Sequence, residues 1–171
     1  MASKTETSER IQAGTPAEVM VSTEVNGRLH EMAVASDMLL VDFLRDRMGL
    51  TGTKFGCDTG QCGSCTILLD GMSVKSCTML AAQADGCRIT TIEGVSTNGS
   101  LTALQNAFWE QHAVQCGYCT PGLILSVADL LNRNPHPNES EIRHWIDGNI
   151  CRCGVYQNVV RAVESITAQP H

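Results

Sequence analysis

The first part of the chain alternates between apolar and polar residues, which is the period of a half-buried β-strand. Every second residue from Val19 to Val25 is valine or threonine, with methionine, serine and glutamate between them. The pair Asn26-Gly27 that follows is a strong signal for a two-residue hairpin turn. We therefore expect one strand up to Val25 and a second strand over about 28–34.

A helix should follow these strands and pack on their sheet. Its apolar residues recur at helical spacing and form one stripe: Leu40, Phe43, Leu44 and Met48. Ser36 or Asp37 is placed to cap the N-terminus of this helix, and Gly49 is a natural end for it.

A second hairpin is predicted further along the chain. Two strand-like runs, 66–69 and 72–75, flank the turn Asp70-Gly71, and residues 88–92 supply one more short strand. These strands, the crossing helix and the long segment between them predict a compact mixed unit that ends near residue 94.

Beyond the punctuated segment Gly94–Gly99 the pattern becomes helical. Three helix starts are marked by N-terminal signals: Thr102 with Gln105, Thr120 with Pro121, and Asn138 with Glu141. A last helix is expected over about 155–167. The apolar positions of these helices are Leu101, Leu104, Phe108, Leu123, Val127, Leu130, Leu131, Ile142, Trp145, Ile146, Tyr156, Val159, Val160 and Val163. Four helices around one small core predict a bundle.

The predicted fold class is therefore α+β, with a strand-rich domain over residues 18–94 and a four-helix bundle over residues 95–171. Residues 1–17 are rich in Ser, Thr, Glu, Lys and Ala without periodicity, so we expect them to form a flexible tail. The change from strand to helix patterns at Gly94–Gly99 marks the boundary between the two domains.

Composition excludes two classes of partner. A net charge of −6 and an aromatic share of 4% leave little to bind phosphates or to stack on bases, so we expect no nucleic acid. No run approaches the ~18 consecutive apolar residues of a membrane span, so we expect no direct membrane insertion. A hydrophobic share of 43% is enough for a globular core.

Nine cysteines dominate the candidate chemistry. The first cysteine set consists of Cys57, Cys62, Cys65 and Cys77. Its first three members have the spacing of a plant-type [2Fe–2S] loop. Four glycines of the same stretch are expected to adopt positive φ and to let backbone N–H groups reach the cluster sulfurs: Gly52, Gly56, Gly60 and Gly63. Zinc is the alternative metal, but a triple of cysteines in a glycine-rich loop fits the paired ligand hooks of zinc poorly.

The second cysteine set consists of Cys116, Cys119, Cys151 and Cys153. It forms two hooks, each at a helix terminus, and antiparallel helices would bring both hooks to the same end of the bundle. Two hooks also resemble a zinc framework, although the single residue between Cys151 and Cys153 is short for the common zinc spacing. From the residues alone, an iron–sulfur cluster and zinc both remain open at this set.

Three motifs in order resemble the signatures of the small iron–sulfur subunit of xanthine-oxidase-family molybdenum hydroxylases. They are Phe55–Thr66, Gln115–Gly122 and Asn149–Gly154, and the resemblance covers about residues 19–166. It implies an N-terminal β-grasp, ferredoxin-like domain and a C-terminal four-helix domain, each holding one [2Fe–2S] cluster.

The resemblance also implies partners and roles. A large subunit would carry molybdopterin and bind substrate, and a medium subunit, where present, would carry FAD, in a heterotrimer or its dimer. The chain would be the electron-transfer subunit of an oxidoreductase, passing single electrons from the molybdopterin centre through two clusters to FAD or another acceptor. The reaction would hydroxylate an N-heteroaromatic or related substrate. By the same resemblance, Gln115 and Cys153 lie nearest the pterin.

Two other functions fit the residues, namely a free ferredoxin-like electron carrier with strongly charged docking faces and a zinc-binding interaction module. The odd number of cysteines, and an N-terminus Met1–Gly14 without an apolar run, favour a reducing cytoplasm over secretion. Cys87 belongs to neither cysteine set and is expected to be an ordinary buried thiol.

Overall fold

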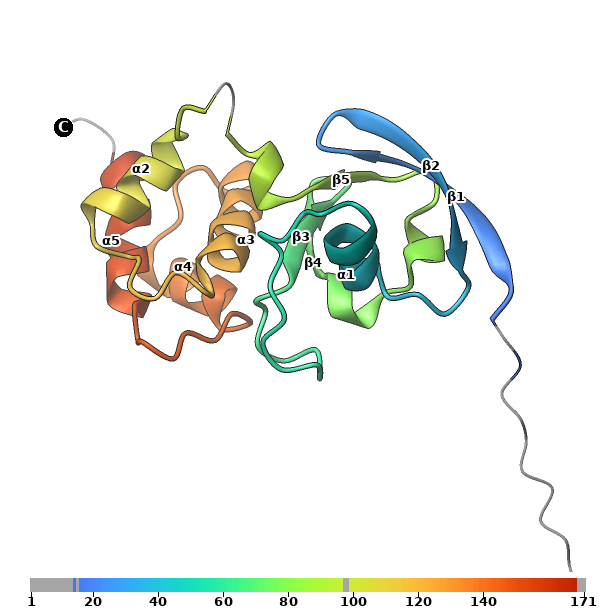
Figure 1. Cartoon of the computed structure of the whole chain (residues 1–171). Coiled ribbons are helices and arrows are strands. Elements are labelled where there is room, and N and C mark those ends of the chain that lie inside the picture. Colours follow the sequence, from blue (N-terminus) through green and yellow to red (C-terminus); the bar gives the residue numbers. More distant parts are fainter. Residues whose placement is uncertain (1–13, 15, 97–98, 169–171) are drawn as a thin grey trace, which may run out of the picture.

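The computed structural model of the chain describes residues 14, 16–96 and 99–168. Of the predicted tail, residues 1–13 and 15 lie outside this described part. The elements follow in the order β1 (Glu18–Val25), β2 (Arg28–Ala35), α1 (Leu40–Asp42), η1 (Phe43–Arg47), β3 (Thr66–Leu69), β4 (Met72–Lys75), η2 (Ser76–Thr78), η3 (Ala81–Ala84), β5 (Arg88–Thr90), η4 (Ile92–Gly94), α2 (Ala103–Glu110), α3 (Thr120–Arg133), α4 (Glu139–Ile146) and α5 (Tyr156–Thr167). Strands come first and the long helices later (Figure 1), which confirms the α+β class.

Among the described residues, five strands form one sheet in the order β2-β1-β5-β3-β4. β1 and β2 pair antiparallel across the predicted turn, in which Asn26 (φ 51°) and Gly27 (φ 78°) both have positive φ. The second predicted hairpin is also confirmed, because β3 and β4 pair antiparallel across Asp70-Gly71. β5 lies between β1 and β3, and it ends at Thr90, before the residue 92 that the pattern indicated.

The helix after β2 is shorter and more loosely wound than its pattern predicts. Its α-helical part is only α1, and η1 continues it as a π-helix in which the Met48 N–H donates to the Phe43 carbonyl at 3.2 Å. The N-cap is Leu39 without a side-chain hydrogen bond, so the predicted cap by Ser36 or Asp37 is wrong. The apolar stripe still packs on the sheet, and its buried residues share one core with the strands: Leu40, Phe43, Leu44, Val21, Val25, Val34, Ile67 and Ile89.

The helical half follows its N-terminal signals closely. Two capping boxes are confirmed at the starts of α2 and α4: Thr102 with Gln105, and Asn138 with Glu141. α3 has Cys119 as its N-cap, so Thr120 lies inside the helix and does not cap it. Leu101 lies before α2 and is exposed, so its predicted place in the core is wrong.

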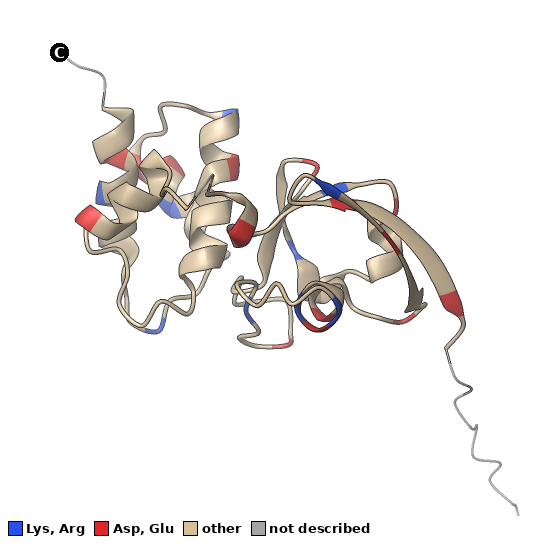
Figure 2. Ribbon diagram, turned by 45° about the horizontal axis from the view of Figure 1, so that its top comes forward, with Lys and Arg blue, Asp and Glu red and all other residues tan. Residues whose placement is uncertain are grey.

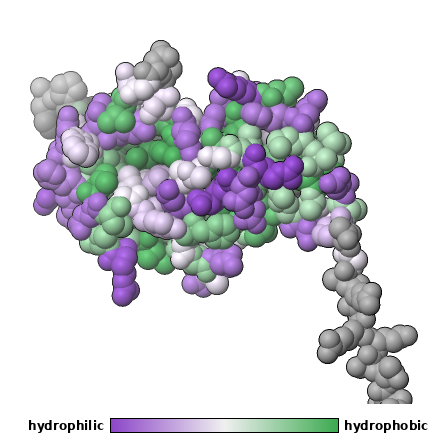
Figure 3. Space-filling view, in the orientation of Figure 1, coloured by the Kyte–Doolittle hydropathy of each residue, from purple (hydrophilic) through white to green (hydrophobic). Residues whose placement is uncertain are grey.

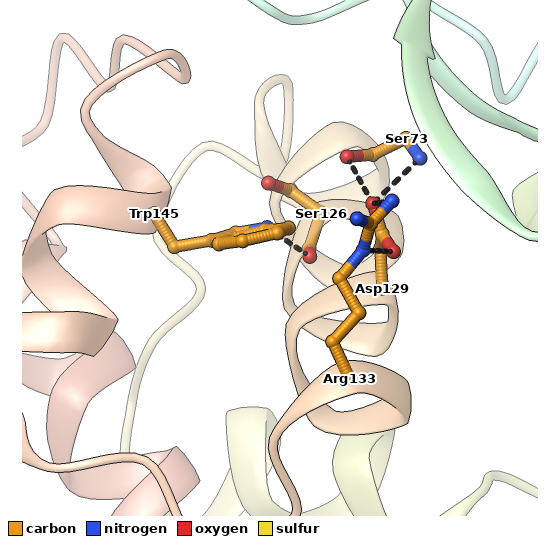
Figure 4. Close-up of polar contacts among 5 residues, drawn as sticks. All are labelled: Ser73, Ser126, Asp129, Arg133 and Trp145. Atoms are coloured by element: carbon orange, nitrogen blue, oxygen red, sulfur yellow. Dashed lines mark hydrogen bonds and ion pairs between the residues drawn. The ribbon is translucent and has the colours of Figure 1, made fainter.

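Two hydrophobic clusters occupy the two halves of the molecule, one at the sheet and one among α2–α5. Figure 1 shows the long helices on one side of the molecule and the sheet on the other, and α3 contacts β3 and β4. A polar contact reinforces this joint, because Asp129 of α3 accepts hydrogen bonds from the backbone N–H (2.8 Å) and hydroxyl (2.7 Å) of Ser73 in β4 (Figure 4).

Charged residues are spread over both halves of the chain (Figure 2). Apolar areas also reach the surface, and Figure 3 shows them over both halves of one face. The large apolar side chains that are exposed are Met20, Leu29, Met72, Leu101, Trp109, Tyr118, Ile150 and Ile166. As for membranes, the described part of the chain has no helix that is both long and apolar enough to cross one.

Candidate metal centres

The β3–β4 hairpin explains how members of the first cysteine set meet. Cys65 directly precedes β3 and Cys77 lies in η2 directly after β4, so the antiparallel pairing of the two strands brings them together. The Ser76 hydroxyl closes this end of the hairpin by donating to the Cys65 carbonyl at 2.8 Å. Cys57 and Cys62 lie in the long loop that leads into β3.

Glycines let this loop wrap closely around the sulfurs. Gly60 (φ 72°) and Gly63 (φ 71°) have the predicted positive φ, whereas Gly52 and Gly56 do not. A Cβ on Gly56 would lie 2.6 Å from the Cys62 Sγ, so a glycine is needed there for space. The prediction for Gly52 is wrong, because its N–H donates to the Glu93 carboxylate at 2.7 Å instead of facing a cysteine.

Backbone N–H groups point at one sulfur of the first cysteine set. The N–H groups of Thr59 (3.4 Å) and Cys62 (3.3 Å) donate to the Cys57 Sγ. Hydrogen bonds from Thr59 and Cys62 lower the pKa of Cys57 to about 6, which favours the thiolate that binds metal. Burial raises the pKa of Cys65 to about 11, and the neighbouring Cys77 thiol adds to this rise. The contacts therefore pair Cys57 with Cys62, and Cys65 with Cys77.

The helical half brings the two hooks of the second cysteine set to one end. Cys119 is the N-cap of α3, while Cys151 and Cys153 lie in the loop that precedes α5. Besides burial, the neighbouring Cys151 thiol raises the pKa of Cys119, and the Cys116 thiol raises the pKa of Cys153, so the sulfurs are close in these two pairs. Each hook thus contributes one sulfur to each of two pairs.

The second cysteine set is electrostatically crowded. Burial, and then the neighbouring Cys151 thiol, raise the pKa of Cys119 to about 12. Burial also opposes ionisation of Cys151, but the Val155 backbone and the Cys119 thiol lower its pKa overall. The Cys116 backbone lowers the pKa of Cys153, whereas the Cys116 side chain and neighbouring negative charge raise it more. A bound cation would relieve this repulsion between thiolates.

Both cysteine sets fit a [2Fe–2S] cluster in their donor chemistry. Each offers four thiols, which is the ligand set of such a cluster, and the ligands are divided between two irons. The paired grouping of the thiols suits that division, and Gly56 leaves the space beside Cys62 free of a side chain. Within residues 14, 16–96 and 99–168, no three His, Cys, Asp or Glu side chains are grouped as a single metal ion would require.

The loops that carry the two cysteine sets touch one another. The Ile150 N–H donates to the Cys62 carbonyl at 2.7 Å, which joins the two loops directly. Cys62 also lines a cavity of about 360 Å³ together with Cys116 and Cys119. In Figure 1 the loops before β3 and before α5 both lie along the lower edge of the molecule.

The residues predicted to lie nearest the pterin are on the exposed side of the second cysteine set. Gln115, Cys116 and Cys153 are all exposed, and Gln115 precedes Cys116, the partner of Cys153. Cys87 is apart from both sets and is half-buried. Its thiol donates to the Asp85 carbonyl at 3.7 Å, and burial raises its pKa.

Three residues beside the cysteines were missed by sequence reasoning. The buried Asn149 donates through its amide to the Gly63 carbonyl at 3.0 Å. The Tyr156 hydroxyl accepts a hydrogen bond from the Cys151 N–H at 2.7 Å. The Tyr118 hydroxyl donates to the Phe55 carbonyl, just before the first cysteine set. Asn149 and Tyr118 lie within the motifs quoted above, but their partners are backbone groups that no sequence pattern reveals.

Two family models match the chain. The model described as a 2Fe-2S iron-sulfur cluster binding domain matches residues 23–90, and the model described as a [2Fe-2S] binding domain matches residues 91–164. The first match spans the first cysteine set and the second match spans the second cysteine set.

Individual relatives are similar over most of their length. The chain is 48% identical over 151 residues to the gamma subunit of caffeine dehydrogenase from Pseudomonas sp. (strain CBB1), covering 86% of this chain and 90% of that subunit. It is 49% identical over 145 residues to the nicotine 6-hydroxylase small subunit from Paenarthrobacter nicotinovorans, covering 85% and 87%. Among solved structures, quinoline 2-oxidoreductase from Pseudomonas putida 86 matches with a TM-score of 0.85 at 44% identity, over 88% of this chain and 93% of that chain.

Proposed function

The chain belongs to the small iron–sulfur subunits of xanthine-oxidase-family dehydrogenases, and we propose that it is the electron-transfer subunit of a multisubunit molybdenum hydroxylase. It has two [2Fe–2S] sites, and when bound, each cluster supplies one-electron transfer. We assign the first cluster to Cys57, Cys62, Cys65 and Cys77, and the second to Cys116, Cys119, Cys151 and Cys153.

One observation carries this proposal more than any other. Two sets of four thiols lie in loops that touch, and the Ile150 N–H of one loop donates a hydrogen bond to the Cys62 carbonyl of the other. Adjacent redox centres in direct backbone contact are what a chain needs in order to pass electrons internally.

The residues around each thiol set have distinct tasks. The thiolates would hold the irons, and the N–H groups of Thr59 and Cys62 would stabilise negative charge on the Cys57 sulfur and so help to set the reduction potential. Tyr156 would fix the backbone at Cys151. Burial of Cys65 and Cys119 would keep water from one side of each cluster.

The exposed residues indicate where electrons enter and leave. We place Gln115 and Cys153 towards a molybdopterin on a large partner subunit, and the first cysteine set towards a FAD on a medium subunit. The exposure of Gln115, Cys116 and Cys153 supports contact with a partner on that side. Exposed apolar side chains such as Trp109, 72% exposed, support burial of this chain in a heterotrimer or its dimer.

We propose an N-heteroaromatic substrate for the assembled enzyme. The relatives and the structural neighbour above are named for caffeine, nicotine and quinoline, which are all nitrogen heterocycles. A cytoplasmic location is proposed because all nine cysteines are free thiols, as is usual in a reducing compartment. Two separate cores support domains over 18–94 and 95–171.

Metal analysis of the assembled protein tests the assignment of the clusters. Two [2Fe–2S] clusters require four iron and four acid-labile sulfide per copy of the chain. Electron paramagnetic resonance (EPR) of the reduced protein should show two distinct signals. Zinc in place of iron at either cysteine set would reject the two-cluster assignment and favour the zinc-binding module.

Native size-exclusion chromatography separates the subunit from a free carrier. A subunit should co-elute with a large molybdenum protein, whereas a free carrier should elute as a monomer with both clusters. Figure 2 shows residues of both charges distributed over both halves of the described part of the chain. Sequencing the co-eluting large subunit and assaying it with nitrogen heterocycles then tests the substrate class.

A further inference from the structure

A buried amide joins the two cysteine loops. Asn149 is only 4% exposed, and its Nδ2 donates to the Gly63 carbonyl at 3.0 Å and to the Thr66 hydroxyl at 3.3 Å. The same hydroxyl donates to the Gly63 carbonyl at 2.7 Å. Asn149 lies two residues before Cys151, and Gly63 directly follows Cys62, so these bonds tie one ligand loop to the other.

Glycines allow the two loops and the start of α3 to meet backbone against backbone. A Cβ on Gly63 would lie 2.4 Å from the Gly148 carbonyl oxygen and 2.7 Å from the Asn149 amide nitrogen. A Cβ on Gly122 would lie 2.4 Å from the Gly63 carbonyl oxygen. Because both positions exclude any side chain, the separation of the two loops is set by direct contact.

The same two loops share a second hydrogen bond, from the Ile150 N–H to the Cys62 carbonyl, which is 2.7 Å long. Cys62 is a proposed ligand of the first cluster, and Ile150 is bonded to Cys151, a proposed ligand of the second. The connection from one ligand to the other therefore consists of backbone atoms and one short hydrogen bond.

We propose that Asn149 is a positioning residue that fixes the two clusters at one separation and keeps the Cys62–Ile150 hydrogen bond in place as the electron route between them. The inference rests on the proposed function, because it needs both cysteine sets to hold clusters. With both clusters bound, a transfer would oxidise one cluster and reduce the other by one electron.

The first test removes the amide donor of Asn149 and keeps the size of the side chain. Asn149→Asp is nearly isosteric, and at a pH high enough to keep this buried carboxyl ionised it cannot donate to Gly63. Asn158→Asp is the matched control, because the Asn158 amide donates to the Gln111 carbonyl at 2.8 Å within the helical half and does not reach the first loop. The readout is the spin–spin interaction between the two reduced clusters in the EPR spectrum of the assembled, dithionite-reduced enzyme.

We expect Asn149→Asp to weaken the spin–spin interaction relative to the unmodified enzyme, while both clusters remain and Asn158→Asp keeps the full interaction. The dipolar part of this interaction falls with the cube of the distance between spins, so it reports the separation directly. A buried amide with only a packing role would leave the interaction unchanged in every variant that retains both clusters.

The second test changes the separation without touching a polar group. Gly122→Ala places a methyl group against the Gly63 carbonyl, whereas Gly148→Ala meets only the Lys75 ammonium, at 3.9 Å. We expect the interaction to weaken in Gly122→Ala and to stay unchanged in Gly148→Ala. This pair tests independently whether the contact between the loops sets the separation of the clusters.

Different results would overturn the proposed function and the positioning role of Asn149. An unmodified enzyme that lacks iron at either cysteine set would overturn the proposed function itself. An unmodified enzyme with both clusters, together with unchanged interactions in the Asn149 and Gly122 variants, would overturn the positioning role alone.

Discussion

A single hydroxyl group holds the backbone of one proposed cluster ligand. The Tyr156 hydroxyl accepts the hydrogen bond from the Cys151 N–H at 2.7 Å, and the Tyr156 ring packs against the helical core. The sequence predicted only the packing role, because the 3.6-residue period places the ring and says nothing of the hydroxyl. The residue therefore links the stability of α5 to the geometry of the second cysteine set.

Substituting Tyr156→Phe should loosen the second cluster selectively. The Cys151 N–H would lose its acceptor, which costs about 1–2 kcal/mol of unfolding free energy for a partly buried group. Incubation with an iron chelator, followed by EPR, should show faster loss of the second signal than in the unmodified protein. The first signal in the same sample is the control, and equal acceleration of both losses would contradict this local role.

Substituting Cys57→Ser should abolish the first cluster and spare the second. The two cysteine sets lie in separate halves with separate cores, so loss of one ligand set leaves the other folded. Iron content should fall to about half of the four atoms that two [2Fe–2S] clusters require. Loss of both EPR signals from a protein that remains folded and assembled would show that the sets are not independent.

At the scale of elements, α3 and β4 are joined by a buried carboxylate. Asp129 is 2% exposed and accepts two hydrogen bonds from Ser73 and two from the Arg133 guanidinium, at 2.6 and 3.5 Å. Arg133 in turn lies over the Trp145 ring at 5.5 Å, and the Trp145 indole donates to the Ser126 carbonyl (Figure 4). A carboxylate with this many donors stabilises the joint only while it is ionised.

The joint should weaken in acid. Burial by itself raises the pKa of Asp129, but hydrogen bonds from Arg133 and Ser73 outweigh burial and lower it from its ordinary value of 3.8. A lowered folded-state pKa gives stability that is full above the unfolded pKa and is lost as the pH falls through the folded pKa.

Asp129→Asn measures this contribution. At neutral pH the variant should be less stable by about 1–3 kcal/mol, because hydrogen bonds to a charged group are replaced by weaker ones. Urea unfolding of both proteins across a pH series should show this difference constant well above pH 3.8 and shrinking below it. Acid damage to the cysteine sites is common to both proteins and cancels in the difference, so a pH-independent difference would contradict the model of an ionised joint.

The elements that were predicted correctly are those fixed by contacts between residues close together in the sequence. The capping boxes at Thr102 and Asn138 and the turn at Asn26-Gly27 rest on contacts within four residues, and all three were predicted correctly. The helix after β2 was predicted at the wrong N-cap, because residues 35–38 form a turn in which the Met38 N–H donates to the Ala35 carbonyl. Leu101 has the helical period but lies outside α2, since the cap at Thr102 starts the helix after it.

At the scale of the whole molecule, the sequence indicated two metal centres but not how they are coupled. The hooks Cys116-Cys119 and Cys151-Cys153 meet because the intervening helices return to the same end, which an antiparallel hairpin already implies. The contact between the two halves depends on the carbonyls of Cys62 and Gly63, and every residue type carries a carbonyl. The buried asparagine and the glycines around it can be seen in the sequence motifs, but the sequence does not show which groups they contact.

The exposed side of the second cysteine set gives the last prediction at this scale, because it concerns how the chain meets its partner. Gln115 is exposed beside Cys116 and, by the proposed orientation, faces the molybdopterin of the large subunit. Gln115→Ala should slow reduction of the clusters by substrate in stopped-flow experiments, while iron content and both EPR signals stay unchanged. Gln61→Ala is the control, since Gln61 is also exposed but flanks the first cysteine set. If electrons enter at the second set, only Gln115→Ala slows the initial reduction; equal rates in both variants would remove Gln115 from the entry side and leave the cluster ligands as assigned.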